Sequence, residues 1–101
     1  MKRPVSLVLV GVGGMGQSYL QALFNEFSPQ ETQISAVIEP CIKNSEVRFD
    51  LEKRNIPLLA HLHTFYESGR SADLVVICSP IHHHVPQACE AFENGSYVLC
   101  E

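Results

Sequence analysis

A chain of 101 residues forms one domain at most, and its hydrophobic fraction of 46% is too high for a disordered segment. The formal net charge is −4 and no basic run occurs, which argues against nucleic acid or an anionic membrane as a partner. No apolar stretch approaches the roughly 20 residues of a membrane-spanning helix. Lys2 and Arg3 precede a short apolar run, but no signal-peptide cleavage site follows. We therefore expect a globular, cytoplasmic domain.

The chain begins with a predicted strand and a predicted helix on either side of a glycine-rich loop. The strand is Val5–Val10, which is apolar except for Ser6, as expected for a parallel strand covered on both faces. The helix runs from about Gly14 to Phe27 and ends at Ser28-Pro29. Its apolar residues on or near one face are Tyr19, Leu20, Leu23, Phe24 and Phe27.

The loop between them has the pattern G-x-G-x-x-G. Its residues are Gly11, Val12, Gly13, Gly14, Met15 and Gly16. Gly11 allows the tight turn out of the strand, Gly13 lets the backbone approach a pyrophosphate, and Gly16 lets the helix pack close to the strand. The helix N-terminus points free N–H groups at the phosphates. In this context the pattern predicts dinucleotide binding over the alternative of a glycine-rich turn without a ligand.

Strands and helices continue to alternate along the rest of the chain. The predicted elements are a strand over Gln33–Ile38, a helix capped by Asn44 or Ser45 with Val47 and Leu51 facing inward, a strand at Leu58–Leu59, a short helix over Thr64–Ser68, a strand over Asp73–Cys78, a helix over about His83–Asn94 and a strand over Tyr97–Cys100. In the last helix apolar residues recur at i, i+3, i+4 and i+7, namely Val85, Ala88, Cys89 and Phe92.

This alternation predicts the fold class. It indicates right-handed crossovers and an α/β, doubly wound parallel sheet with strand order 3-2-1-4-5 in a three-layer αβα arrangement, the Rossmann fold. A ligand then lies where the order reverses, between the first and fourth strands. The loops at the carboxyl ends of these strands, Gly11–Gly16 and Ser79–His84, are the two most unusual stretches of the chain.

Glu39 ends the second predicted strand, where an acidic side chain accepts hydrogen bonds from the adenosine ribose hydroxyls. A carboxylate at this point repels a 2′-phosphate, so NAD is favoured and NADP is left as the second choice. The other interpretation of Glu39 is an exposed glutamate at a strand end.

Three adjacent histidines, His82, His83 and His84, raise the question of a metal site. Zinc needs about four ligands at suitable spacing, and the only other histidines, His61 and His63, lie before the preceding helix. We therefore predict no metal site. The loop is interpreted as a cofactor contact, with a polar loop and helix start as the alternative.

The four cysteines, Cys41, Cys78, Cys89 and Cys100, show no C-x-x-C spacing. Disulfides would need a secretory context, so we interpret the cysteines as buried free thiols.

Three passages together resemble the N-terminal domain of the Gfo/Idh/MocA family of oxidoreductases. They are Val10–Gly16, Asp73–His84 and Gly95–Glu101. The fourth strand of the family ends in Thr/Ser-Pro-x-x-x-His, which Ser79, Pro80 and His84 match, and a later G-x-x-V-x-x-E-K-P motif is matched by Gly95, Val98 and Glu101. Two departures are the Glu at position 39, where Asp is frequent, and His83 at a position that is more often apolar.

The resemblance implies roles for these positions. It implies that Gly11–Gly16 hold the pyrophosphate and Glu39 the adenosine ribose. Ser79, Pro80 and His84 would line the nicotinamide side, with Glu101 near the nicotinamide ribose. The chain stops before the catalytic lysine of E-K-P and before the substrate domain, so residues 1–101 are expected to be a dinucleotide-binding domain with no catalytic residue and no turnover of its own.

The parent protein would then transfer a hydride between the nicotinamide and a hydroxyl-bearing carbon of a sugar- or cyclitol-like substrate, which it would reach through a missing C-terminal domain. Two alternatives are a non-catalytic NAD-sensing regulatory or assembly domain, and a parent similar to biliverdin reductase or a semialdehyde dehydrogenase. Apolar surface left without the second domain would favour a homo-oligomer.

Overall fold

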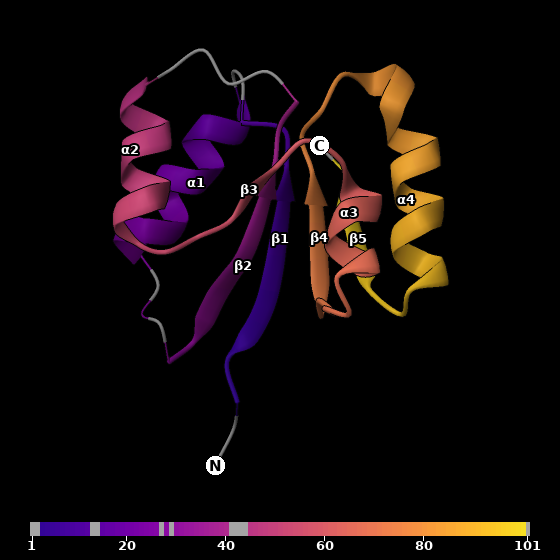
Figure 1. Ribbon diagram of the computed structural model, residues 1–101, viewed down its shortest axis with the longest axis horizontal. Coiled ribbons are helices and arrows are strands. Elements are labelled where there is room, and N and C mark those ends of the chain that lie inside the picture. The colour runs from indigo at the N-terminus through magenta and orange to yellow at the C-terminus, as the bar shows by residue number, and fades with distance from the viewer. Residues whose placement is uncertain (1–2, 13–14, 27, 29, 41–44, 101) are drawn as a thin grey trace.

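Five strands form one parallel sheet in the computed structural model, which describes residues 3–12, 15–26, 28, 30–40 and 45–100 (Figure 1). The strands are β1 (Val5–Val10), β2 (Thr32–Ile38), β3 (Leu58–Leu59), β4 (Leu74–Ile77) and β5 (Tyr97–Cys100). Their order is β3-β2-β1-β4-β5, and every neighbouring pair is parallel. The predicted Rossmann order is confirmed.

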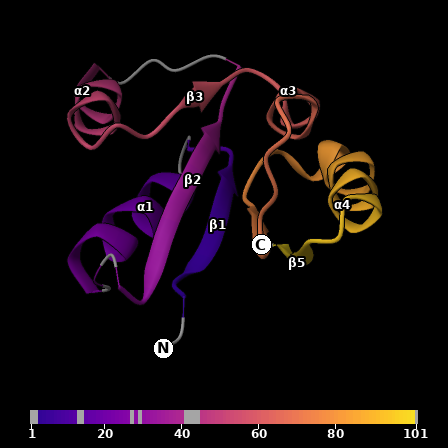
Figure 2. The ribbon, with the colours of Figure 1, turned by 60° about the horizontal axis from the view of Figure 1, so that its bottom comes forward.

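Helices cover both faces of the sheet. They are α1 (Met15–Glu26), α2 (Ser45–Lys53), α3 (Leu62–Glu67) and α4 (His84–Glu93), with a 3₁₀ turn η1 (Ile81–His83) that leads into α4. Figure 2 shows α1 and α2 on one side of the sheet and α3 and α4 on the other. The three-layer arrangement follows from the crossovers, because each helix returns the chain to the amino edge of the sheet.

Alternate residues of the central strand β1 supply the two halves of the core. Val8 and Val10 face α3 and α4, where they pack with Phe65. Leu7 and Leu9 face α1 and α2, where Leu20, Val47 and Leu51 are buried. This burial on both faces explains why the residues of β1 are almost all apolar.

The ends of several elements differ from the prediction. Helix α3 starts at Leu62 rather than Thr64, and Leu62 is buried. The last helix begins at His84, within one residue of the prediction, but a 3₁₀ turn over Ile81–His83 that was not predicted precedes it and leaves His83 as its N-cap. Phe27 of the first predicted helix and Asn44, a candidate cap of the second, lie outside the described residues.

The spacing of apolar residues identified α4 as a helix but does not mark its buried face. Val85 and Phe92 are exposed by 72% and 62%, and Cys89 is exposed as well. The buried face instead carries Ala91, which is fully buried, and the half-buried Ala88. Small residues stand there because α4 packs close to the sheet.

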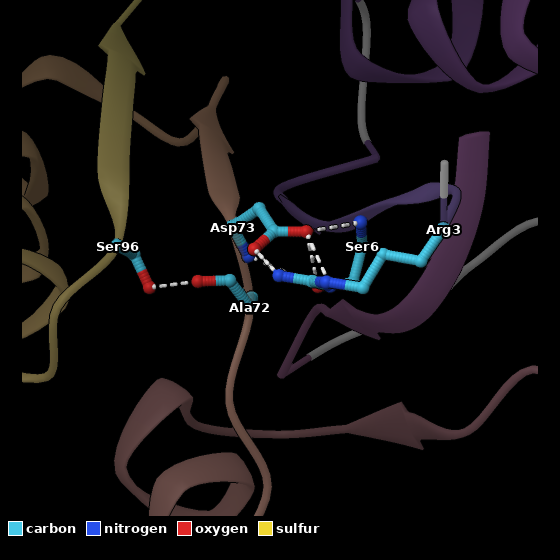
Figure 3. A network of polar contacts seen from close by, with 5 residues as sticks. All are labelled: Arg3, Ser6, Ala72, Asp73 and Ser96. Atoms are coloured by element: carbon cyan, nitrogen blue, oxygen red, sulfur yellow. Dashed lines mark hydrogen bonds and ion pairs between the residues drawn. The ribbon is translucent and has the colours of Figure 1, made fainter. Parts of the chain in front are cut away.

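Asp73 ties the amino ends of β1 and β4 together. Its carboxylate accepts hydrogen bonds from the backbone N–H of Ser6 at 2.9 Å and from two nitrogens of Arg3 at 2.7 and 3.0 Å (Figure 3). The backbone N–H of Asp73 in turn donates to the carbonyl oxygen of Ser6. On the far side of β4, the buried Ser96 hydroxyl donates to the carbonyl oxygen of Ala72.

These contacts lower the pKa of Asp73, first through the hydrogen bonds from Arg3 and then through the Ser6 N–H. A carboxyl whose pKa is lower in the folded chain stabilises the fold above its unfolded pKa of about 3.9, and this stabilisation is lost as pH falls through the folded value.

We expect Asp73→Asn to lower the urea midpoint of unfolding at pH 7, because the bidentate ion pair is lost. The difference from the wild-type chain should shrink as pH falls below about 4, where the wild-type carboxyl takes up its proton. Arg3→Ala should lower the urea midpoint by a smaller amount, since the contacts between Asp73 and Ser6 remain. A difference that stays constant down to pH 2 would contradict the assignment.

Candidate dinucleotide site

A cavity of about 350 Å³ opens at the carboxyl edge of the sheet. The residues that line it include Val10, Gly11, Ile38 and Glu39 at the ends of β1 and β2, His61 and His63 at the start of α3, and Ser79, Pro80, His83 and Gln87 after β4. The cavity therefore lies across the point where the strand order reverses, as predicted for a ligand of a doubly wound sheet.

Gly11 turns the chain out of β1 in a conformation that a side chain would not allow. Its φ is +87°, and a Cβ atom would lie 2.7 Å from the backbone nitrogen of Ser79 and 2.9 Å from the carbonyl carbon of Cys78. The Gly11 N–H donates to the carbonyl oxygen of Ile38 at 2.8 Å. The first glycine of the loop thus holds together the ends of β1, β2 and β4.

Gly16 lets α1 begin directly against the end of β1. A Cβ atom there would overlap the carbonyl oxygen of Gly11 and would lie 3.3 Å from the Cβ atom of Cys78. Because the nearest obstacle is backbone, no change of rotamer could relieve it. Val12 is buried, Met15 is the first residue of α1, and Gly13 and Gly14 lie outside the described residues.

Glu39 reaches from the end of β2 back to the glycine loop. Its Oε1 accepts a hydrogen bond from the Val12 N–H at 3.0 Å, and the side chain is half-buried at the cavity wall. The Glu39 N–H donates to the carbonyl oxygen of Leu59, which fixes the strand end. A carboxylate acceptor is therefore held beside the backbone of the loop.

The loop after β4 is braced by α4. The Ser79 hydroxyl donates to the Gln87 side-chain oxygen, and the His84 ring nitrogen Nε2 donates to the Ser79 carbonyl oxygen at 2.6 Å. A carbonyl oxygen only accepts, so the proton of this bond belongs to Nε2. Ser79 and Pro80 lie on the cavity wall, whereas His84 supports Ser79 and is not part of the wall. Glu101 lies outside the described residues.

His61 and His63 belong to the cavity wall, although the sequence suggested no role for them beyond remote metal ligands. Their rings stack with centroids 5.2 Å apart and an interplanar angle of 11°. The sequence could have indicated this position, because both histidines closely follow β3 and the carboxyl ends of parallel strands share one edge of the sheet. Within the described ranges, no group of three or more His, Cys, Asp or Glu residues is arranged to hold a metal ion.

The interpretation of the cysteines as buried thiols is wrong for two of them. Cys78 is half-buried, but Cys89 and Cys100 are exposed and are free thiols, and Cys41 lies outside the described residues. Cys89 lies on the outer flank of α4 and Cys100 on the edge strand β5, two places that the apolar neighbours of these residues did not reveal. In the described part of the chain, no helix is long and apolar enough to cross a membrane.

Comparison with families gives one match over almost the whole chain. The model of the Gfo/Idh/MocA oxidoreductase family, described as having an NAD-binding Rossmann fold, matches residues 5–101. A search of curated proteins found no significant match in sequence.

Solved structures match the fold closely at low sequence identity. The chain is similar to apo scyllo-inositol dehydrogenase from Lactobacillus casei, with a TM-score of 0.80 and 17% identity over 99% of this chain. The structure of the same enzyme with bound NAD(H) and scyllo-inositol has a TM-score of 0.79 and 16% identity over 97% of this chain. The WlbA dehydrogenase from Chromobacterium violaceum, in complex with NADH and UDP-GlcNAcA, has a TM-score of 0.79 and 21% identity over 99% of this chain. The chain spans 28% of the length of each of these proteins.

We expect Gly16→Ala and Gly11→Ala to abolish dinucleotide binding and to destabilise the fold, because each Cβ atom would overlap backbone. Gly95→Ala is the matched control, since Gly95 has a φ of +81° but open space around its Cα atom. Left-handed backbone strain alone costs about 1–2 kcal/mol. Urea unfolding should therefore show a several-fold larger loss of unfolding free energy for the two loop variants than for Gly95→Ala. Equal losses for all three would contradict the close-approach argument.

Proposed function

Because this chain belongs to the Gfo/Idh/MocA family of oxidoreductases and has its NAD-binding Rossmann fold, we propose that it binds NAD along the carboxyl edge of the sheet. The observation that carries the proposal is the contact between the Glu39 carboxylate and the Val12 N–H. It joins the ribose-binding position at the end of β2 to the phosphate-binding loop, beside a cavity that crosses the switch point.

The pyrophosphate is proposed to lie over Gly11–Gly16. The backbone of Gly11 passes close to the end of β4, and α1 begins with Met15 and the buried Gly16. A helix N-terminus at this point offers N–H donors and the positive end of the helix dipole to an anion. Val12, Gly13 and Gly14 complete the proposed loop.

Glu39 is proposed to select NAD over NADP. A carboxylate accepts hydrogen bonds from the two hydroxyls of the adenosine ribose, and it repels the 2′-phosphate that distinguishes NADP. The support is the position of the side chain at the cavity wall, half-buried and oriented by the loop backbone.

The nicotinamide is proposed to lie on the side of the loop that follows β4. Ser79 and Pro80 are on the cavity wall, and His84 fixes Ser79 through its carbonyl oxygen. Glu101 is assigned to the nicotinamide ribose on the family pattern alone. When bound, the nicotinamide supplies the carbon that accepts or donates the hydride.

The activity of a whole protein with this domain is proposed to be hydride transfer between the nicotinamide and a hydroxyl-bearing carbon of a sugar- or cyclitol-like substrate, with loss of the hydroxyl proton to a base. The names of similar structures include an inositol and a nucleotide sugar. Since this chain spans 28% of those proteins, the substrate pocket and the base are assigned to residues beyond it. We also propose that the domain is cytoplasmic and that its copies associate.

A non-catalytic NAD-sensing domain would use the same cavity, so binding does not separate the two functions. Hydride transfer by a protein that contains this domain with residues beyond Glu101 would separate them. The 101-residue chain is expected to show no turnover under either function.

Calorimetric titration tests the site. NADH should bind in the range of tens to hundreds of micromolar, with NADPH weaker. Glu39→Ala should weaken NADH binding about tenfold, since a hydrogen bond to a charged group contributes about 1.5–3 kcal/mol. Glu39→Ala should also reduce the preference of the chain for NADH over NADPH. Glu67→Ala, an exposed carboxylate at the end of α3, is the control.

Two results would contradict the assignment. Equal affinity of the folded chain for NADH and NADPH would remove the selective role of Glu39. An unchanged NADH affinity in Glu39→Ala would remove the proposed contact with the ribose.

A further inference from the structure

Two histidine rings lie on the cavity wall beside the strand end that carries Glu39. The Glu39 N–H donates at 2.8 Å to the carbonyl oxygen of Leu59, the last residue of β3. His61 and His63 follow β3 directly, and both line the cavity together with Glu39. Their stacked rings form one unit at the start of α3. The two imidazoles and the Glu39 carboxylate therefore border the same cavity from neighbouring strand ends.

The charge of the cavity wall depends on its histidines. Among the described residues that line it, the ionisable ones are Glu39 at the end of β2, His61 and His63 at the start of α3, His83 in η1 and Glu90 in α4, and none is Lys or Arg. Carboxylates are ionised above about pH 5, whereas imidazole ordinarily changes its charge between about pH 5 and 8. At high pH the wall therefore has negative charge only, and acidification adds up to three positive charges.

We propose that His61 and His63 determine how strongly the site discriminates against the 2′-phosphate of NADP, and that their protonation weakens this discrimination. The proposal rests on the proposed function, because it takes the adenosine ribose to lie at Glu39. A 2′-phosphate on that ribose would lie beside the Glu39 carboxylate, with the two imidazoles on the neighbouring strand end. A protonated imidazole donates from both ring nitrogens, and a charged donor of this kind binds phosphate oxygens strongly.

Comparison of the two dinucleotides isolates this effect. NAD and NADP share the pyrophosphate, so any general effect of the wall charge acts on both. We define the selectivity ratio as the dissociation constant of NADP divided by that of NAD. Protonation of His61 and His63 should lower this ratio. A phosphate monoester also takes up a proton near pH 6, but this change is the same for every variant of the chain.

Calorimetric titration with NAD and NADP at about pH 8 and about pH 6 tests the proposal. In the wild-type chain the selectivity ratio should fall about fivefold between these pH values, the factor that one exposed charge pair contributes. In the double variant His61→Gln/His63→Gln it should change by less than about twofold. The wild-type change should also shrink at about 1 M salt, where the screening length falls to about 3 Å.

His82→Gln is the matched control. His82 is an exposed histidine of the same chain that does not line the cavity, so its loss should leave the fivefold change intact. His61→Arg places a permanent charge on the wall and should lower the selectivity ratio at pH 8. His61 and His63 are exposed, and His61 makes no side-chain cap bond to α3, so these variants should fold. Circular dichroism and NAD binding at pH 8 verify the fold.

Three results would overturn the proposal while the NAD site stands. They are a wild-type selectivity ratio that is independent of pH, a change that the double variant retains in full, and an equal loss of the change in His82→Gln. Failure of a folded wild-type chain to bind either dinucleotide would overturn the proposed function, and this role of the histidines with it.

Discussion

The close approach of three backbone segments at the switch point is the constraint on which the rest of the structure depends. A Cβ atom on Gly16 would overlap the Gly11 carbonyl oxygen, and a Cβ atom on Gly11 would meet the backbone of Ser79. Helix α1, the end of β1 and the loop after β4 can therefore meet only if two positions lack side chains. Their meeting brings the N-terminal end of a helix and the two central strand ends to one edge of the sheet, and such an edge is where a doubly wound sheet binds a phosphate-containing ligand.

The two ends of the sheet are held in different ways. At the amino edge, the Asp73 carboxylate, Arg3 and Ser6 fix β1 against β4 through side-chain contacts that a change of pH can weaken. At the carboxyl edge, the fixed points are backbone contacts, the bond from Val12 to Glu39 and the bonds of Gln87 and His84 with Ser79. A site whose loops are held by hydrogen bonds within the chain needs less ordering on binding. The Asp73 anchor therefore lies at the opposite edge of the sheet from the cavity.

The sequence was sufficient for the fold because the strands are central and buried. Val8 and Leu9 are fully buried, and an apolar run of this kind between turn residues has few alternatives to a parallel strand. The positions of Gly11 and Glu39 at the cavity were predictable because the strand order places the carboxyl ends of β1 and β2 side by side. His61 and His63 were missed because only β3, a strand of two residues, carries them to the cavity. Helix ends shifted by up to two residues, since Leu62 and Ile81 can start a turn without a capping side chain.

Helix α4 shows why an apolar pattern does not by itself identify a buried face. Its inner side has to pack close to β4 and β5 and also to hold the loop at Ser79, so it combines small Ala91 with polar Gln87 and His84. The larger apolar residues are left on the outer flank, where Val85 and Phe92 face solvent. The side of α4 that holds the Ser79 loop therefore carries small and polar residues instead of large apolar ones.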